Sequence, residues 1–198
     1  MEENKLKTIF ESSYQNPKDA KKTLEEYGFT YDTELSSPDT KVFTDVLGNP
    51  HIAYRGSHRV EDVLTDIKLG LGYDTKRHKE AKELAKMVES KYGKSASAYG
   101  HSLGGHLAEK SGVSGTVYTF NKATGIKDIF KTIPKTQIDY RTEKDIVSLP
   151  SLLQSGGKKI TIESGRDQNI LKAHSTSSFG GKKIGKSRGL SLPNFKFF

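Results

Sequence analysis

The chain has 198 residues and a formal net charge of +8, and 33% of its residues are hydrophobic against 28% charged. The absence of cysteine excludes disulfides and thiolate metal sites. No stretch is apolar over the length of a membrane span, and the first ten residues lack the apolar core of a signal peptide. We therefore expect one soluble globular domain over residues 1–198, which contacts membranes only at their surface.

Positive charge is concentrated near the C-terminus. Residues 151–198 contain nine Lys/Arg and two Asp/Glu, a net charge of +7. A basic surface attracts anionic partners, phospholipid headgroups among them. Residues 180–198 are rich in glycine and lysine and predict an irregular basic tail whose last phenylalanines, Phe195, Phe197 and Phe198, pack back onto the domain. Nucleic acid is a less favoured partner because no aromatic–basic recognition motif accompanies the lysines.

In chain order, the pattern first predicts helix within residues 1–27, broken at Asn16 and Pro17, with Asn16 as N-cap of the second helix. Two short strands follow at 41–46 and 51–54, joined by a hairpin turn at 47–50. Apolar residues at helical spacing predict two further helices. These cover residues 59–69 and 76–92.

The second half of the chain alternates strands with helices. A strand is predicted to end at Gly100, and a helix follows at 102–111. Further strands are predicted at 116–120, at 137–141 and, at the edge of the sheet, at 158–164. Such alternation is typical of an α/β domain with a mostly parallel central sheet flanked by helices.

One short segment carries a catalytic signature. Residues 100–105 read GHSLGG, which places Ser102 in a G-x-S-x-G arrangement between a strand and a helix. In this motif the serine occupies a strained turn and its hydroxyl projects above the sheet. The alternative is an ordinary glycine turn, but the apolar strand before it and the packing positions Leu103 and Leu107 after it favour a nucleophile elbow.

A serine nucleophile needs a base and an acid that orients the base. In an elbow-type fold the chain order is serine, acid, histidine, and of the six histidines only His174 fits that order cleanly. For the acid we favour Asp145, which follows the strand 137–141 across a short turn, with Glu143 as runner-up. The other acids downstream of the serine are Asp128, Asp139, Glu163 and Asp167.

Two donors are expected to stabilise an oxyanion. One is the main-chain N–H of Leu103, and the other is the N–H or hydroxyl of Ser57, in the loop after an early strand. Neighbouring polar residues are interpreted as structural. His101 is expected to pack and hydrogen-bond under the elbow, and Arg55 and Arg141 to pair with carboxylates or stiffen turns. No metal-ligand spacing or phosphate-binding loop is present in the sequence.

Three segments together resemble the class 3, fungal-type lipases of the α/β-hydrolase superfamily. They are AYRGSHRVEDVLTDI, YGHSLGGHLAE and YRTEKDIVSLP, which correspond to the oxyanion, elbow and acid segments of that family, and the match spans about residues 41–179. The resemblance implies Ser102 as nucleophile, Asp145 as acid and His174 as base, with Ser57 and Leu103 as oxyanion hole. It implies no metal or organic cofactor.

The sequence departs from that family where a lid is expected. Residues 68–78 are short, polar and glycine-containing, and Val63 replaces a typical aromatic residue. These departures weaken the case for a bulky triacylglycerol, and a phospholipid or a short-chain glyceride fits the sequence about equally well. The prediction is a serine ester hydrolase of lipase or phospholipase A type. The alternatives are a catalytically inactive lipid- or membrane-binding module of the same fold and nucleic-acid binding through the tail.

Overall fold

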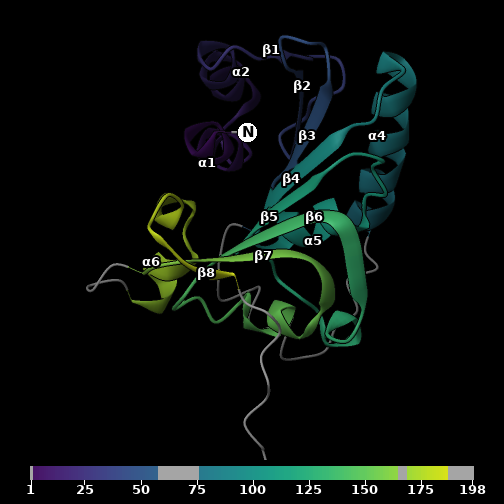
Figure 1. Ribbon diagram of the computed structural model, residues 1–198. Coiled ribbons are helices and arrows are strands. Elements are labelled where there is room, and N and C mark those ends of the chain that lie inside the picture. The colour runs from purple at the N-terminus through teal and green to yellow at the C-terminus, as the bar shows by residue number, and fades with distance from the viewer. Residues whose placement is uncertain (1, 58–75, 165–168, 187–198) are drawn as a thin grey trace, which may run out of the picture.

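The computed structural model describes residues 2–57, 76–164 and 169–186. Within them, eight strands form a single sheet whose spatial order is the chain order, β1 to β8 (Figure 1). The strands are β1 (Thr30–Tyr31), β2 (Thr40–Thr44), β3 (Pro50–Tyr54), β4 (Ser97–His101), β5 (Val117–Phe120), β6 (Thr132–Thr142), β7 (Ser155–Ile162) and β8 (Lys183–Lys186).

Helices cover both faces of this sheet. The α-helices are α1 (Glu3–Ser12), α2 (Pro17–Glu26), α4 (Lys76–Tyr92), α5 (Leu103–Lys110) and α6 (Ile170–His174). Three short 3₁₀ helices are η1 (Ile126–Asp128), η2 (Leu149–Leu153) and η3 (Thr176–Ser178). Helices α1 and α2 lie on one side of the sheet, and α4 and α5 lie on the other (Figure 1).

The strand directions bring the functional loops together. Strands β3 to β7 run parallel, whereas β1, β2 and β8 are antiparallel to their neighbours. The carboxyl ends of the parallel strands therefore meet at one edge, where open α/β sheets place their ligands. The predicted fold class, an α/β-hydrolase sheet flanked by helices, is confirmed.

Alternation along the strands divides the core into two layers. Side chains of β2 show it: Phe43 packs in the layer beneath α1 and α2, whereas Val42 packs in the layer beneath α4 and α5. Strand β4 repeats the pattern with Tyr99 and Ala98. Because both faces are apolar, the central strands are buried on both sides, as parallel sheets require.

The C-terminal part differs from the prediction. The segment at 158–164 was expected at the edge, but β7 lies between β6 and β8, so β8 is the edge strand. The irregular tail predicted for residues 180–198 is also wrong for Lys183–Lys186, which form β8. The strand was missed because four residues with a lysine at each end show little alternation of apolar and polar side chains. Lysines of this kind are common on edge strands. Residues 187–198 lie outside the described residues.

Near the N-terminus the helix prediction is confirmed. Asn16 caps α2, since its side chain accepts a hydrogen bond from the Asp19 N–H at 3.0 Å, and Pro17 is the first helical residue. Strand β1 was not predicted because it has only two residues. The predicted helix 59–69, which contains Val63, and residues 68–75 of the short lid segment lie outside the described residues.

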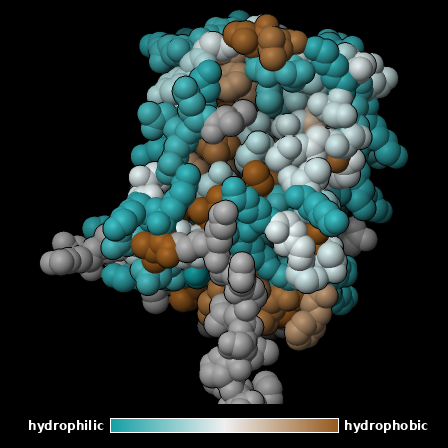
Figure 2. All heavy atoms as spheres, in the orientation of Figure 1, coloured by the Kyte–Doolittle hydropathy of each residue, from teal (hydrophilic) through white to brown (hydrophobic). Residues whose placement is uncertain are grey.

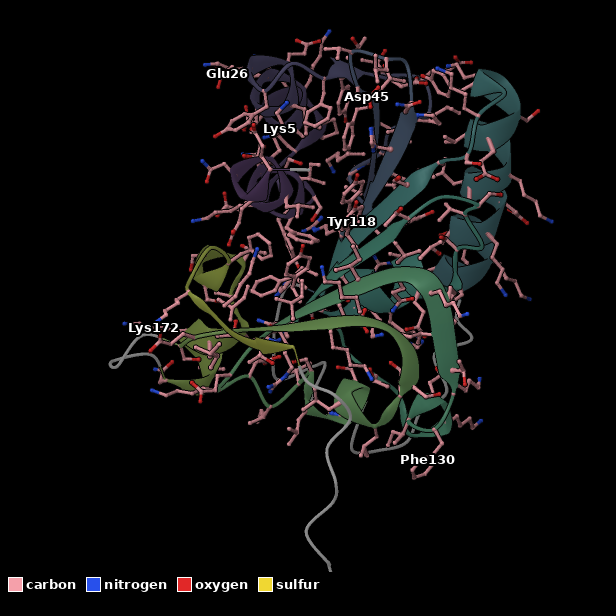
Figure 3. The ribbon with its side chains drawn as sticks, viewed as in Figure 1. Lys5, Glu26, Asp45, Tyr118, Phe130 and Lys172 are labelled. Atoms are coloured by element: carbon pink, nitrogen blue, oxygen red, sulfur yellow. The ribbon has the colours of Figure 1, made fainter. Side chains whose placement is uncertain are left out.

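The face shown in Figure 2 is mainly hydrophilic. Apolar atoms gather at its top, over the loop between β2 and β3, where Val46 and Leu47 are 87% and 74% exposed. Lys172 projects outward from α6, and Phe130 points away from the sheet (Figure 3). Across the described ranges, none of the helices has the length and apolar character needed to cross a bilayer.

Candidate active site

Ser102 occupies the turn between β4 and α5. Its φ of 57° and ψ of −125° are unusual for a residue with a side chain, and it is only 2% exposed. The main chain holds this conformation: the Ser102 N–H donates to the Phe120 carbonyl at 3.0 Å, and its carbonyl accepts from Ala123 at 3.1 Å. Strain of this kind is concentrated at functional sites.

Glycines allow the elbow to pack closely. A Cβ atom on Gly100 would collide with the main chain of Gly104, and one on Gly104 would collide with the carbonyl oxygen of Tyr54 at the end of β3. A Cβ on Gly56 would meet the carbonyl oxygen of His101. Small residues at these positions therefore let the loop after β3 lie directly against the elbow.

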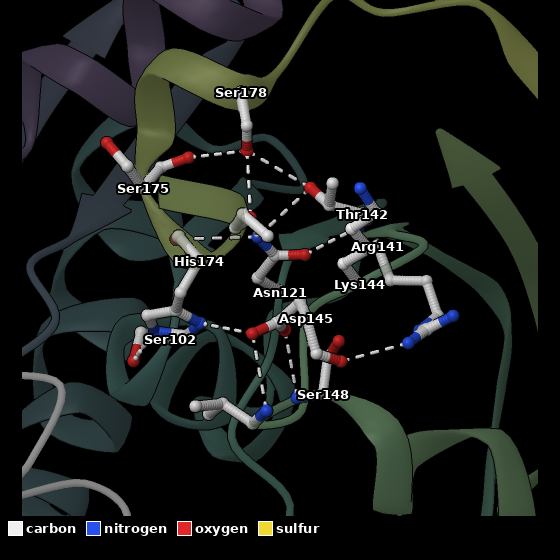
Figure 4. Close-up of polar contacts among 12 residues, drawn as sticks. Ser102, Asn121, Arg141, Thr142, Lys144, Asp145, Ser148, His174, Ser175 and Ser178 are labelled. Atoms are coloured by element: carbon white, nitrogen blue, oxygen red, sulfur yellow. Dashed lines mark hydrogen bonds and ion pairs between the residues drawn. The ribbon is translucent and has the colours of Figure 1, made fainter. Parts of the chain in front are cut away.

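The structure brings together the three residues predicted as a triad (Figure 4). His174 Nε2 lies 2.9 Å from Ser102 Oγ, and His174 Nδ1 lies 2.8 Å from Asp145 Oδ1. A carboxylate only accepts hydrogen bonds, so Nδ1 carries the proton and Nε2 of the neutral ring is free to accept from the serine hydroxyl. His174 and Asp145 are each 1% exposed.

The environment of Asp145 favours its charged form. Burial opposes ionisation, but the hydrogen bond from His174 and the main-chain N–H of Ser148, at 2.9 Å from Oδ2, outweigh it and lower the pKa of Asp145. The Val147 N–H adds a third bond at 3.2 Å. Arg141 donates to the main-chain carbonyl of Asp145 at 2.9 Å, so it stiffens the acid loop as expected.

The predicted oxyanion donors lie on both sides of the elbow. Leu103 is the first residue of α5, and the first N–H groups of a helix have no partner within the helix. Ser57 follows Gly56 in the loop after β3 and is half-buried. Because Gly56 packs against the elbow, the loop that contains Ser57 lies next to the turn that contains Ser102.

Among the residues that the structure describes, the other candidate acids do not face His174. Glu143, the runner-up, is exposed. Asp139 is buried and accepts hydrogen bonds from Thr119 and Lys122 at 2.6 and 3.0 Å, which is a structural role. Asp128 pairs with Lys110 of α5 and with Lys131, which lies between η1 and β6. Glu163 is exposed, and Asp167 lies outside the described residues.

His101 packs beneath the elbow, as predicted. Its Nε2 lies 2.5 Å from the carbonyl oxygen of His174, so Nε2 carries the proton, and its Nδ1 accepts from the Tyr14 hydroxyl at 2.7 Å. Burial and the nearby His174 lower the pKa of His101 to about 3, which keeps the ring neutral. Tyr14 was not foreseen, because it lies 87 residues away from His101 along the chain.

A cluster of polar side chains next to the loop of His174 was not predicted from the sequence. Asn121, Thr142 and Ser178 are buried and hydrogen-bonded to each other or to the histidine loop (Figure 4). The only local signal was an asparagine directly after a strand, a residue type that tolerates positive φ. Among the residues that the structure describes, no group of three or more His, Asp or Glu is arranged to hold a metal ion.

Solved structures share this fold. The Rhizomucor miehei lipase in its propeptide complex superposes with a TM-score of 0.55 at 14% identity, over 90% of this chain and 76% of that one. A fungal lipase–inhibitor complex gives 0.54 at 17%, over 81% and 78%. These matches show that the chain has the α/β-hydrolase fold of the fungal lipases, which confirms the resemblance in fold to the fungal-type lipases.

A family model narrows this class. The model described as the Tle-like phospholipase domain matches residues 5–152, and the chain belongs to this phospholipase-like family. An extracellular phospholipase A1 of Serratia liquefaciens is 32% identical over 78 residues, which are 39% of this chain. The match covers 24% of that relative, so the two proteins share a segment and not their whole length.

Proposed function

We propose that the protein is a serine carboxylic-ester hydrolase that cleaves acyl esters of lipids, with Ser102 as nucleophile, His174 as base and Asp145 as orienting acid. The observation that carries the proposal is the buried chain of hydrogen bonds from Asp145 through His174 to Ser102, with lengths of 2.8 and 2.9 Å. Its support is the strained elbow geometry at Ser102 and membership of a phospholipase-like family.

The first half of the reaction forms an acyl-enzyme. Ser102 Oγ attacks the ester carbonyl carbon while its proton moves to Nε2 of His174, and Asp145 stabilises the resulting imidazolium. The N–H of Leu103 and the N–H or hydroxyl of Ser57 donate to the oxyanion. Collapse of the tetrahedral intermediate breaks the bond to the alcohol, which leaves with the proton from His174.

The second half releases the acid. Water gives a proton to Nε2 of His174 and attacks the acyl carbonyl carbon, and the same donors stabilise the second oxyanion. The bond to Ser102 Oγ then breaks, and His174 returns the proton to the serine. The products are a carboxylic acid and the free enzyme, and no step requires a metal or an organic cofactor.

Phospholipid is the favoured substrate class. The matched family is phospholipase-like, and the name of the Serratia relative assigns phospholipase A1 activity to that protein. Residues 151–198 carry a net charge of +7, which suits an anionic membrane surface. One of these charges is the exposed Lys172, which projects outward from α6, the helix that ends at His174 (Figure 3).

A panel of substrates tests the proposal. p-Nitrophenyl esters of increasing chain length and phospholipid vesicles with and without anionic lipid are assayed with the wild type and Ser102→Ala. We expect hydrolysis by the wild type, none above background by Ser102→Ala, and tighter association with the anionic vesicles. Vesicle binding without ester hydrolysis would instead identify an inactive lipid-binding module, and equal binding to both vesicle types would remove the membrane part of the proposal.

A further inference from the structure

Asn121 stands at the first position after β5, fully buried, with a φ of 45°. A side chain in this left-handed region is strained, although asparagine tolerates it better than most residues. Glycine would adopt the same φ with less strain. The backbone alone therefore does not require asparagine at this position.

The amide joins two loops. Its Oδ1 accepts from the main-chain N–H of Thr142, at the end of β6, at 2.7 Å. Its Nδ2 donates to the carbonyl of Ala173 at 2.9 Å and lies 3.4 Å from the carbonyl of His174 and 3.3 Å from Thr142 Oγ1. Both the oxygen and the nitrogen of the amide thus have hydrogen-bond partners. The nitrogen points at the main-chain carbonyls of Ala173 and His174, the second of which is the proposed base.

Residue 121 also lies close to the segments of the other two triad residues. The residues on either side of the pair 121–122, Phe120 and Ala123, hydrogen-bond to the main chain of Ser102. Asp145 donates its N–H to the carbonyl of Thr142 at 3.1 Å. Residue 121 therefore connects all three segments: its side-chain amide joins the acid and base segments, and the main chain on either side of it holds the nucleophile turn.

The histidine segment depends on such support. His174 ends α6, a helix of five residues, and helices this short have little stability of their own. Ser178 provides a second bond to the same carbonyl of Ala173, at 2.9 Å. These bonds add to those that His101 and Asp145 make with His174, so the imidazole is held by distant segments as well as by its own short helix.

We propose that Asn121 is a positioning residue that sets His174 in register with Ser102 and Asp145 through its side-chain amide. The inference rests on the proposed function. A displacement of about 1 Å in a catalytic group lowers the rate by roughly 100-fold, so loss of the amide reduces the rate of chemistry more than it reduces substrate affinity.

Asn121→Gly separates the conformational role of residue 121 from the role of its amide, because glycine adopts the same backbone conformation but has no side chain to make the hydrogen bonds. With p-nitrophenyl butyrate we expect kcat to fall by about 10- to 100-fold and KM to stay within about twofold of wild type. The rate of labelling by a fluorophosphonate, which needs the same base, falls in parallel. The circular dichroism spectrum stays native at the assay temperature.

The matched control is Asn49→Gly. Asn49 also uses its amide to hold a turn, through Asp45, but at the opposite end of β3 from the elbow. Its kcat should equal that of the wild type. Ser178→Ala is a second test, since it removes the other bond to Ala173 at a residue with ordinary backbone geometry; we expect a smaller, severalfold loss of kcat at unchanged KM.

A folded Asn121→Gly with wild-type kcat would overturn the inference and leave a purely conformational role for Asn121. If Asn121→Gly does not fold, Ser178→Ala decides: a lower kcat at unchanged KM supports the inference, and an unchanged kcat overturns it. A wild type that neither turns over esters nor reacts with the fluorophosphonate would overturn the proposed function itself, and the inference with it.

Discussion

The two halves of the candidate active site are held in different ways. Ser102 is fixed by its own neighbourhood in sequence, because Gly100 and Gly104 let the strand, turn and helix pack main chain against main chain. His174 belongs to a five-residue helix and is held by side chains from distant segments. These are Asp145, His101 and Asn121, with Tyr14 behind His101.

This difference separates the serine turn, which is fixed by residues adjacent in sequence, from the histidine, which is fixed by residues distant in sequence. Backbone contacts of the elbow leave no room for a methyl group, so substitutions there should act on folding. Side-chain hydrogen bonds around His174 leave the fold intact when one is lost, so substitutions there should act mainly on rate. The following changes test that division, from the largest expected effect to the smallest.

Substitution of the acid–base pair should give the largest loss. His174→Ala and Asp145→Asn are each expected to lower kcat/KM for p-nitrophenyl butyrate by about 10⁴-fold, since the first removes the base and the second disturbs its tautomer and orientation. Glu143→Gln, an exposed acid two residues before Asp145, is the control and should match the wild type. Equal losses for Glu143→Gln and Asp145→Asn would mean that the acid is misassigned.

On the elbow side, Gly104→Ala should unfold or strongly destabilise the protein. The added methyl group would collide with the carbonyl oxygen of Tyr54, which is backbone and has no freedom to move away. We expect the free energy of unfolding in urea to fall by about 3 kcal/mol or more. Gly112→Ala is the control, because Gly112 has a φ of 77° and open space around it, and should cost about 1–2 kcal/mol from strain alone. Similar costs at the two sites would contradict the close-packing argument.

Buried neutral histidines should make stability fall in mild acid. Burial is the main cause that lowers the pKa of His101 to about 3 and that of His106 to about 4, against an ordinary value of 6.5. Between these values the unfolded chain binds more protons than the folded one, so stability is lost as the pH falls below about 6.5. Between about pH 7 and pH 5 each histidine should remove on the order of 2 kcal/mol from the free energy of unfolding. Urea titrations at the two pH values check this, and equal midpoints would show that both rings bind protons as readily in the folded protein as in the unfolded chain.

The smallest expected effect is that of Tyr14→Phe. It removes the hydroxyl that donates to His101 Nδ1, and with it one layer of support for the His174 carbonyl. We expect a loss of about 1 kcal/mol in unfolding free energy and a severalfold lower kcat. Tyr27→Phe, at a tyrosine that is 40% exposed, is the control for loss of a phenol hydroxyl. A Tyr14→Phe variant with wild-type kcat would limit the role of this contact to packing.

The features of this molecule that the sequence predicts are those that depend on residues adjacent in the chain. The GHSLGG turn, the cap at Asn16 and the central strands all follow from residues adjacent in sequence. Asp145 and His174 follow from chain order once an elbow is assumed. Asn121 and Tyr14 act through hydrogen bonds to residues 52 and 87 positions away, and no periodicity records such pairs. The edge position of β8 was missed for the same reason, because pairing with β7 is decided by tertiary contacts.

Covalent capture tests the central proposal most directly. The purified protein is treated with a fluorophosphonate probe and digested, and the modified peptide is identified by mass spectrometry. We expect a single adduct on Ser102, formed quickly in the wild type, slowly in His174→Ala and not at all in Ser102→Ala. An unmodified Ser102 in folded wild-type protein, or an adduct on another serine, would contradict the assignment of Ser102 as the nucleophile.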